Sequence, residues 1–94
     1  MNIVDPAVIQ FANDNFYLAF NSRDIVQMRD LWAADCPCVC IHPGWAPLLG
    51  RDEILESWDN IFNRQEPGVQ IVCHSPRVLS QGDLFSVICY EQLP

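Results

Sequence analysis

The chain has 94 residues, a formal net charge of −7 and an apolar content of one half, and it contains no lysine. Its five arginines are spread singly along the chain, whereas nucleic acids and anionic membranes are bound by clustered cations, so composition argues against both partners. The length favours one domain covering residues 1–94, small enough to leave much of its surface exposed.

The cysteine content and the N-terminus predict a reducing, cytoplasmic location. The number of cysteines is odd, and the first residues show neither the basic nor the apolar region of a secretory signal. No apolar run approaches the roughly 20 residues of a membrane span. We therefore expect five free thiols: Cys36, Cys38, Cys40, Cys73 and Cys89.

Three helices are expected before residue 64. The first follows Asp5, a good N-cap residue, and begins with Pro6, whose missing N–H costs nothing at that position. The second follows Asp24, and the third opens at Gly50. Apolar residues at helical spacing set the expected ranges, which are 6–20, 25–33 and 51–63.

The expected strands, one short and two longer, lie on either side of the third helix. Residues 38–42 read as a strand that stops at a Pro-Gly pair, and residues 45–49 read as a loop. Residues 69–79 and 84–93 read as partner strands around a Gly82-Asp83 turn, with Pro76 marking a bulge or an edge position. The predicted order is helix, helix, strand, helix, strand, strand.

This order, with particular residues at particular places, resembles the SnoaL-like branch of the nuclear transport factor two-like superfamily. The most specific part is His42-Pro43-Gly44-Trp45 followed by Gly50-Arg51 and Ser57-Trp58. Further matching segments are Phe16-Tyr17-Leu18-Ala19-Phe20, Arg23-Asp24, Leu31-Trp32-Ala33, Gly82-Asp83 and Tyr90-Glu91. The resemblance covers nearly the whole chain.

The resemblance implies an α+β fold. A curved antiparallel sheet packs on three N-terminal helices in a cone-like, cystatin-like roll with a pocket inside, and family members usually add two last strands that this sequence lacks. It also implies a homodimer formed through the outer sheet face, and it calls for no cofactor. The superfamily includes ketosteroid isomerase, polyketide cyclases and dehydratases.

His42 is the leading candidate for catalysis. The resemblance places it at the end of the first strand, where ketosteroid isomerase carries its aspartate base. An imidazole titrates near neutral pH, so it could move a proton at a substrate carbon. The alternative is a structural histidine that fixes the Pro43-Gly44 turn through a bond to a backbone carbonyl.

The oxyanion donors of the isomerase are poorly matched. Its first-helix tyrosine corresponds to Phe16, which has no donor, and Tyr17 lies about a hundred degrees around the helix. Its second donor, a protonated acid in a late strand, has only Glu91 as a counterpart here. The sequence therefore argues against ketosteroid isomerase activity itself.

Cys38, Cys40 and His42 alternate along the first predicted strand, so all three should share one face. Thiolates and imidazole are zinc and copper ligands, but the spacing differs from that of known zinc motifs. We therefore favour small buried residues at these positions and predict no metal.

The aromatic residues belong to the core, to a ligand pocket, or to both. Small-molecule pockets are commonly lined by aromatic side chains, so helical periodicity alone does not separate the two roles. We predict a small apolar or aromatic ligand held by Phe16, Tyr17, Trp32, Trp45, Trp58 and Glu91, with Trp45 at the pocket mouth. The favoured function is small-molecule binding, with lyase or isomerase proton transfer through His42. The alternatives are a non-catalytic dimerisation or interaction module and a truncated inactive copy.

Overall fold

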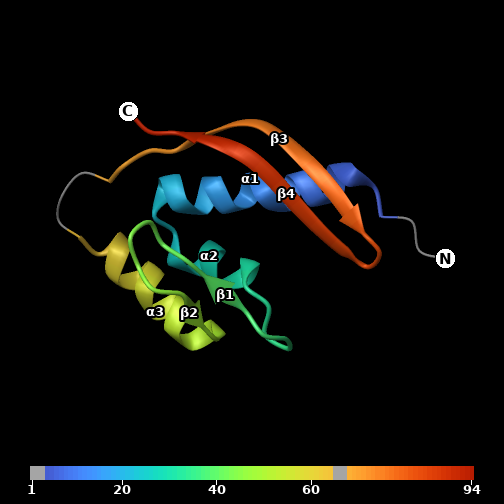
Figure 1. Cartoon of the computed structure of the whole chain (residues 1–94). Coiled ribbons are helices and arrows are strands. Elements are labelled where there is room, and N and C mark those ends of the chain that lie inside the picture. Colours follow the sequence, from blue (N-terminus) through green and yellow to red (C-terminus); the bar gives the residue numbers. More distant parts are fainter. Residues whose placement is uncertain (1–3, 65–67) are drawn as a thin grey trace.

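The computed structural model describes residues 4–64 and 68–94 (Figure 1). The elements, in chain order, are α1 (Pro6–Ser22), α2 (Ile25–Leu31), β1 (Val39–Cys40), β2 (Leu48–Leu49), α3 (Arg51–Phe62), β3 (Val72–Gln81) and β4 (Leu84–Gln92). The α+β prediction, with three helices and antiparallel strands, is confirmed. In the described part of the chain the strands pair as two hairpins, β1 with β2 and β3 with β4.

Local signals in the sequence account for the helix ends. The Asp5 carboxylate accepts a hydrogen bond from the Ala7 N–H, and the Asp24 carboxylate accepts from Val26 and Gln27, so both predicted N-caps are confirmed. Helix α2 is shorter than expected because Trp32 already has extended backbone angles. Arg51 donates hydrogen bonds to the Trp32 and Arg29 carbonyls, so these carbonyls at the C-terminal end of α2 have partners.

Two strand predictions needed correction. Residues 45–49 were expected to form a loop, but Leu48 and Leu49 pair with Cys40 and Val39 as strand β2. Strand β1 covers only two residues, so alternation does not carry Cys38 and His42 onto a common face. The Cys38 thiol instead lies against the Ala33 carbonyl at 3.2 Å.

The β3–β4 hairpin has the predicted turn and bulge. Gly82, at a φ of 67°, lies in the turn, where a positive φ favours glycine. The register shifts between His74 and Arg77, the segment that contains Pro76, and Ser75 adopts a φ of 54° there. Figure 1 shows this hairpin lying across α1.

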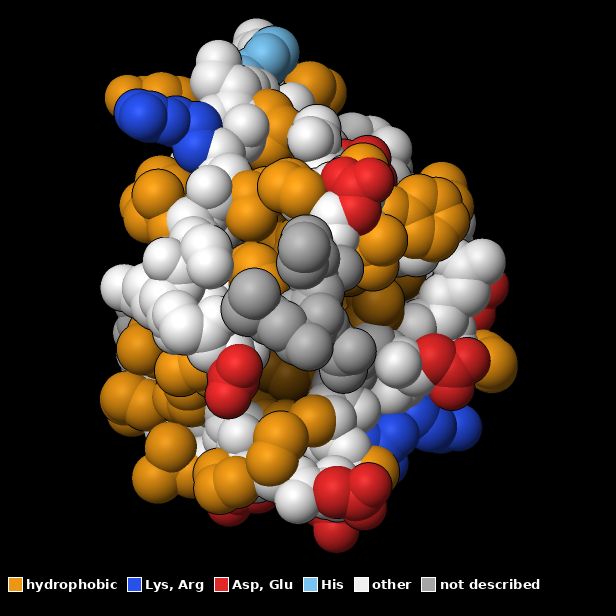
Figure 2. Space-filling view, turned by 90° about the vertical axis from the view of Figure 1, so that its right-hand side faces the viewer, with side chains coloured by type: hydrophobic (Ala, Val, Ile, Leu, Met, Phe, Trp, Pro, Cys, Tyr) orange, Lys and Arg blue, Asp and Glu red, His pale blue; other side chains and the backbone are white. Residues whose placement is uncertain are grey.

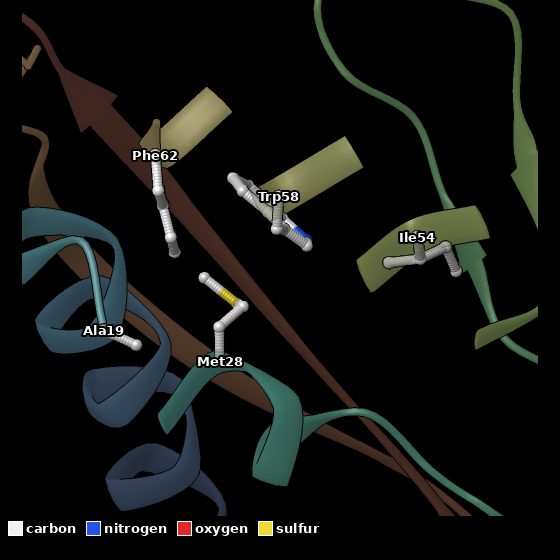
Figure 3. Close-up of a cluster of buried hydrophobic side chains, with 5 residues drawn as sticks. All are labelled: Ala19, Met28, Ile54, Trp58 and Phe62. Atoms are coloured by element: carbon white, nitrogen blue, oxygen red, sulfur yellow. The ribbon is translucent and has the colours of Figure 1, made fainter. Parts of the chain in front are cut away.

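The buried core lies among the helices (Figure 3). Its fully or nearly buried side chains are Ala19 from α1, Met28 from α2, and Ile54, Trp58 and Phe62 from α3. The three residues of α3 recur every four positions, so they share the face that packs on the other helices.

Hydrophobic side chains also remain on the surface. Figure 2 shows them spread over one face of the molecule, between scattered acidic and basic groups. On β4, Leu84, Ile88 and Tyr90 are 71%, 57% and 77% exposed, whereas Phe85, Val87 and Cys89 alternate with them and are half-buried toward α1. In the described part of the chain no helix is both long and apolar enough to cross a membrane.

Candidate functional site

A cavity of about 480 Å³ lies between α1, α3, the residue after α2, the segment after β1 and the end of β4. Most of its lining is aromatic or aliphatic, as is usual for small-molecule sites. Its polar side chains are few, which makes each one informative about a ligand. The lining residues are Phe16, Phe20, Trp32, Cys40, Ile41, His42, Pro43, Trp45, Trp58, Ile61, Arg64, Val69, Ile71, Glu91 and Leu93.

His42 contributes to this cavity although its side chain is only 6% exposed. Its ring makes edge-to-face contacts with Trp45 and Trp58, with centroids 4.8 and 4.7 Å away. Because two indoles hold the imidazole edge-on, its orientation is fixed before any ligand arrives. The Trp45 N–H also donates to the His42 carbonyl at 2.9 Å, which closes the Pro43-Gly44 turn.

The hydrogen bonds of Ser57 determine which imidazole nitrogen carries the proton. The Ser57 hydroxyl donates to the Ile54 carbonyl at 2.6 Å, so its single hydrogen is used there. His42 Nε2 lies 2.9 Å from the same oxygen and must therefore donate to it. In the neutral ring this leaves Nδ1 with the lone pair, and Cys40 Sγ lies 4.0 Å from it.

Burial lowers the pKa of His42 below its ordinary value, because the low-dielectric surroundings disfavour the charged imidazolium. At neutral pH the ring is therefore neutral, with a proton on Nε2 and a basic Nδ1. Burial raises the pKa of the neighbouring Cys40 thiol for the same reason, so this thiol is protonated. His42 is thus a weak base next to apolar walls.

Tyr17 and Glu91 form a second polar pair. The Tyr17 hydroxyl donates to Glu91 Oε2 at 2.7 Å and lies 3.2 Å from Cys89 Sγ. The pKa of Tyr17 is raised, first by burial and then by these two partners, so the phenol stays protonated and remains a donor. Glu91 lines the cavity, whereas Tyr17 lies behind it on α1.

The structure brings together most of the residues expected to bind a ligand. Phe16, Trp32, Trp45, Trp58 and Glu91 line the cavity with His42. Tyr17 does not, because its ring is turned toward the hairpin. Trp45 is 45% exposed, in keeping with its place in the segment between β1 and β2.

Sequence reasoning missed Ser57, which acts through His42, and three residues of the cavity lining. Ser57 was noticed only as part of a motif, although it orients the imidazole from fifteen positions away. Its place one residue before Trp58, on the buried face of α3, was the available signal. Arg64, Ile61 and Ile71 also line the cavity and carried no recognisable pattern.

Within the described residues, no group of three or more His, Cys, Asp or Glu side chains is arranged to hold a metal ion. Cys40 and His42 lie side by side, with Sγ 3.8 Å from Nε2, but Cys38 is turned away to Ala33. The predicted common face of these three residues is therefore not formed.

Comparison with known proteins supplies the family. The model of the SnoaL-like domain family matches residues 9–94. The chain belongs to this family. None of the curated proteins compared matches it.

A solved structure supports the assignment. It is a candidate dehydratase of the NTF2-like family from Streptomyces avermitilis, 32% identical to this chain, with a TM-score of 0.80. The match covers 90% of this SnoaL-like chain and 64% of the other, so the chain spans less than two thirds of the length of that structure. The NTF2-like fold predicted from the sequence is thereby confirmed.

Proposed function

We propose that this SnoaL-like domain binds a small apolar or aromatic molecule in the aromatic cavity and that His42 transfers a proton to or from it. The observation that carries the proposal is the neutral imidazole on the cavity wall, with Nε2 committed to Ser57 and Nδ1 free to accept. A base whose pKa lies near or below neutrality is unprotonated in the cell and ready to accept a proton.

The chemistry that fits is an elimination or an isomerisation. Nδ1 would take a proton from a carbon made acidic by an adjacent carbonyl, and the Nε2–H bond to Ser57 would keep the ring in place as charge develops. The same nitrogen would return the proton to the leaving hydroxyl in a dehydration, or to another carbon in an isomerisation. The description of the Streptomyces structure as a candidate dehydratase supports the elimination.

A thermal melt with a panel of small aromatic, carbonyl and steroid-like ligands tests the binding step. A ligand that binds only the native state raises the melting temperature. Ligands found in this way are then assayed for turnover with the wild type and with His42→Gln, which keeps a hydrogen-bond donor but lacks the base. We expect binding to survive and turnover to be lost. Unchanged turnover in His42→Gln would show that the imidazole is not the base.

A second candidate function, a non-catalytic dimerisation module, is favoured by the exposed apolar face of β4. Leu84, Ile88 and Tyr90 would be covered if two copies met through this face. Sedimentation equilibrium measures the association directly. If the protein is monomeric at all concentrations and its cavity binds a ligand, the dimerisation function is excluded and the small-molecule-binding function remains.

A further inference from the structure

Among the described residues that line the cavity, the acidic one is Glu91, an exposed residue at the end of β4. In the described part of the chain its carboxylate has a single hydrogen-bond donor, the Tyr17 hydroxyl, which is bound through Oε2. Oε1 therefore retains its full capacity to accept. A carboxylate fixed through one oxygen and open through the other, at the wall of an aromatic cavity, is a receptor for a hydrogen-bond donor.

The charges around the cavity favour a cationic donor. The net charge of the chain is −7, and His42 is neutral because of its burial, so the imidazole does not repel a cation. Arg64, which follows α3, is the one cation among the lining residues that the structure describes, and its side chain is exposed. Within residues 4–64 and 68–94, no ion pair neutralises Glu91, so its charge is available to a ligand.

The walls suit the same ligand class. Three indole side chains and two phenyl side chains line the cavity, from Trp32, Trp45, Trp58, Phe16 and Phe20. The faces of aromatic rings attract cations, most strongly those of tryptophan, and aromatic walls also cover an apolar body. An acidic group beside such walls selects an organic cation over both a neutral analogue and an anion.

We propose that the cavity is selective for an apolar molecule bearing a protonated amine, with the ammonium bound by Glu91 and the apolar body packed on the aromatic walls. This inference rests on the proposed function, because it requires a ligand in the cavity. Tyr17 is then a positioning residue: it holds Oε2 so that Oε1 faces the ammonium, and it does not itself touch the ligand.

Three probes with one skeleton separate charge recognition from cavity filling: 1-naphthylmethylamine, 1-naphthylmethanol and 1-naphthoic acid. Their dissociation constants would be measured by titration calorimetry with the wild type, Glu91→Gln and Glu56→Gln. The last variant removes an equal charge from the exposed side of α3. We expect the amine to bind at least tenfold more tightly than the alcohol in the wild type and in Glu56→Gln. In Glu91→Gln most of this preference should disappear, with the alcohol unchanged, because only the attraction of the aromatic walls for a cation remains.

The variant Tyr17→Phe tests the positioning role. The measured quantity is the preference for the amine over the alcohol, which a purely structural role of Tyr17 would leave unchanged. We expect Tyr17→Phe to reduce the preference for the amine about threefold while the affinity for the alcohol stays constant, since only the orientation of the Glu91 carboxylate changes. A similar loss for both probes would show that Tyr17 supports the cavity and not the recognition of the amine.

The unfavourable outcomes are distinct. Equal binding of amine and alcohol to the wild type, or an amine preference that persists undiminished in Glu91→Gln, overturns the inference while leaving the binding function intact. A preference reduced equally by Glu56→Gln and Glu91→Gln assigns it to net charge and also overturns the inference. If none of the three probes binds, the proposed function fails and the selectivity for amines falls with it.

Discussion

The helical layer and the β3–β4 hairpin are built differently. Helices α1, α2 and α3 supply all five residues of the buried hydrophobic core, whereas no described residue of β3 or β4 is fully buried. The hairpin packs one face on α1 and leaves Ile88, Tyr90 and their neighbours exposed on the other.

Because of this difference, the two polar residues His42 and Glu91 of the cavity depend on regions of unequal stability. The helical layer can hold His42, Trp58 and Ser57 rigidly because they sit in or beside the core. Glu91 depends on the hairpin, which is tied to the rest of the molecule by fewer buried side chains. Segments of this kind open locally at lower free energy than the core. We therefore expect the base to stay in place under conditions in which the carboxylate does not.

The largest effect is expected from Met28→Ala. Met28 is fully buried between α1 and α3, and replacing such a side chain by alanine costs about 2–5 kcal/mol, a large part of the stability of a small domain. Urea unfolding would measure this loss. Val26→Ala, at a position 60% exposed on the same helix, is the control and should change stability by less than about 0.5 kcal/mol. Equal effects would mean that α2 does not pack as described.

Asn21→Ala is expected to loosen the hairpin selectively. The Asn21 amide donates to the Ile71 carbonyl at 2.9 Å and accepts from the Ile71 N–H at 2.8 Å, which anchors the segment entering β3 to the end of α1. Losing both bonds should cost about 1–3 kcal/mol. Hydrogen exchange should accelerate in β3 and β4 and stay constant in α2 and α3. Uniform acceleration would show one cooperative unit and would remove the contrast between the two regions.

Ser57→Ala is expected to cost about 1–2 kcal/mol, because it leaves the buried Nε2–H of His42 without an acceptor. The nitrogen chemical shifts of His42 would report the change, since the preference for the Nε2–H tautomer should weaken. Ser80→Ala, at an exposed position on β3, serves as the control and should leave both stability and the tautomer unchanged. A tautomer that does not respond to Ser57→Ala would contradict the assigned role.

These sites illustrate what the sequence could predict. Local signals were sufficient for the caps at Asp5 and Asp24 and for the irregularity at Pro76, because each depends on neighbouring residues. The two-residue strand β2 was missed, since Leu48-Leu49 after a proline is too short to show the alternation of apolar and polar residues that predicts a strand. The family resemblance led to His42, and the predicted cavity residues other than Tyr17 line one cavity.

The partnerships within the site could not be predicted. Tyr17 and Glu91 are 74 positions apart, and nothing in either neighbourhood indicates the other. The tautomer of His42 depends on a hydroxyl fifteen positions away whose own hydrogen is already committed. Pairings of this kind follow from packing between elements, whereas a single sequence reports mainly local preference and periodicity.

The pH dependence of stability tests the buried imidazole. The pKa of His42 is lowered in the folded chain, so below the ordinary value of about 6.5 the unfolded chain binds more protons than the native one. Stability should therefore fall as the pH drops from 7 toward the folded pKa, by about 1.4 kcal/mol for each unit between the two pKa values. Comparing wild type with His42→Gln across this range isolates the effect, while His74→Gln, on the exposed hairpin, is the control.

The smallest effect on the monomer is expected from Ile88→Thr on the outer face of β4. Ile88 is 57% exposed, and threonine keeps the branched side chain that suits a strand, so the free energy of unfolding should change by less than about 0.5 kcal/mol. If two copies meet through this face, sedimentation should instead show a marked loss of association, because an apolar contact is replaced by a hydroxyl that must be desolvated. An unchanged association constant would place any dimer contact elsewhere, and a large loss of monomer stability would show that the face is already packed within one chain.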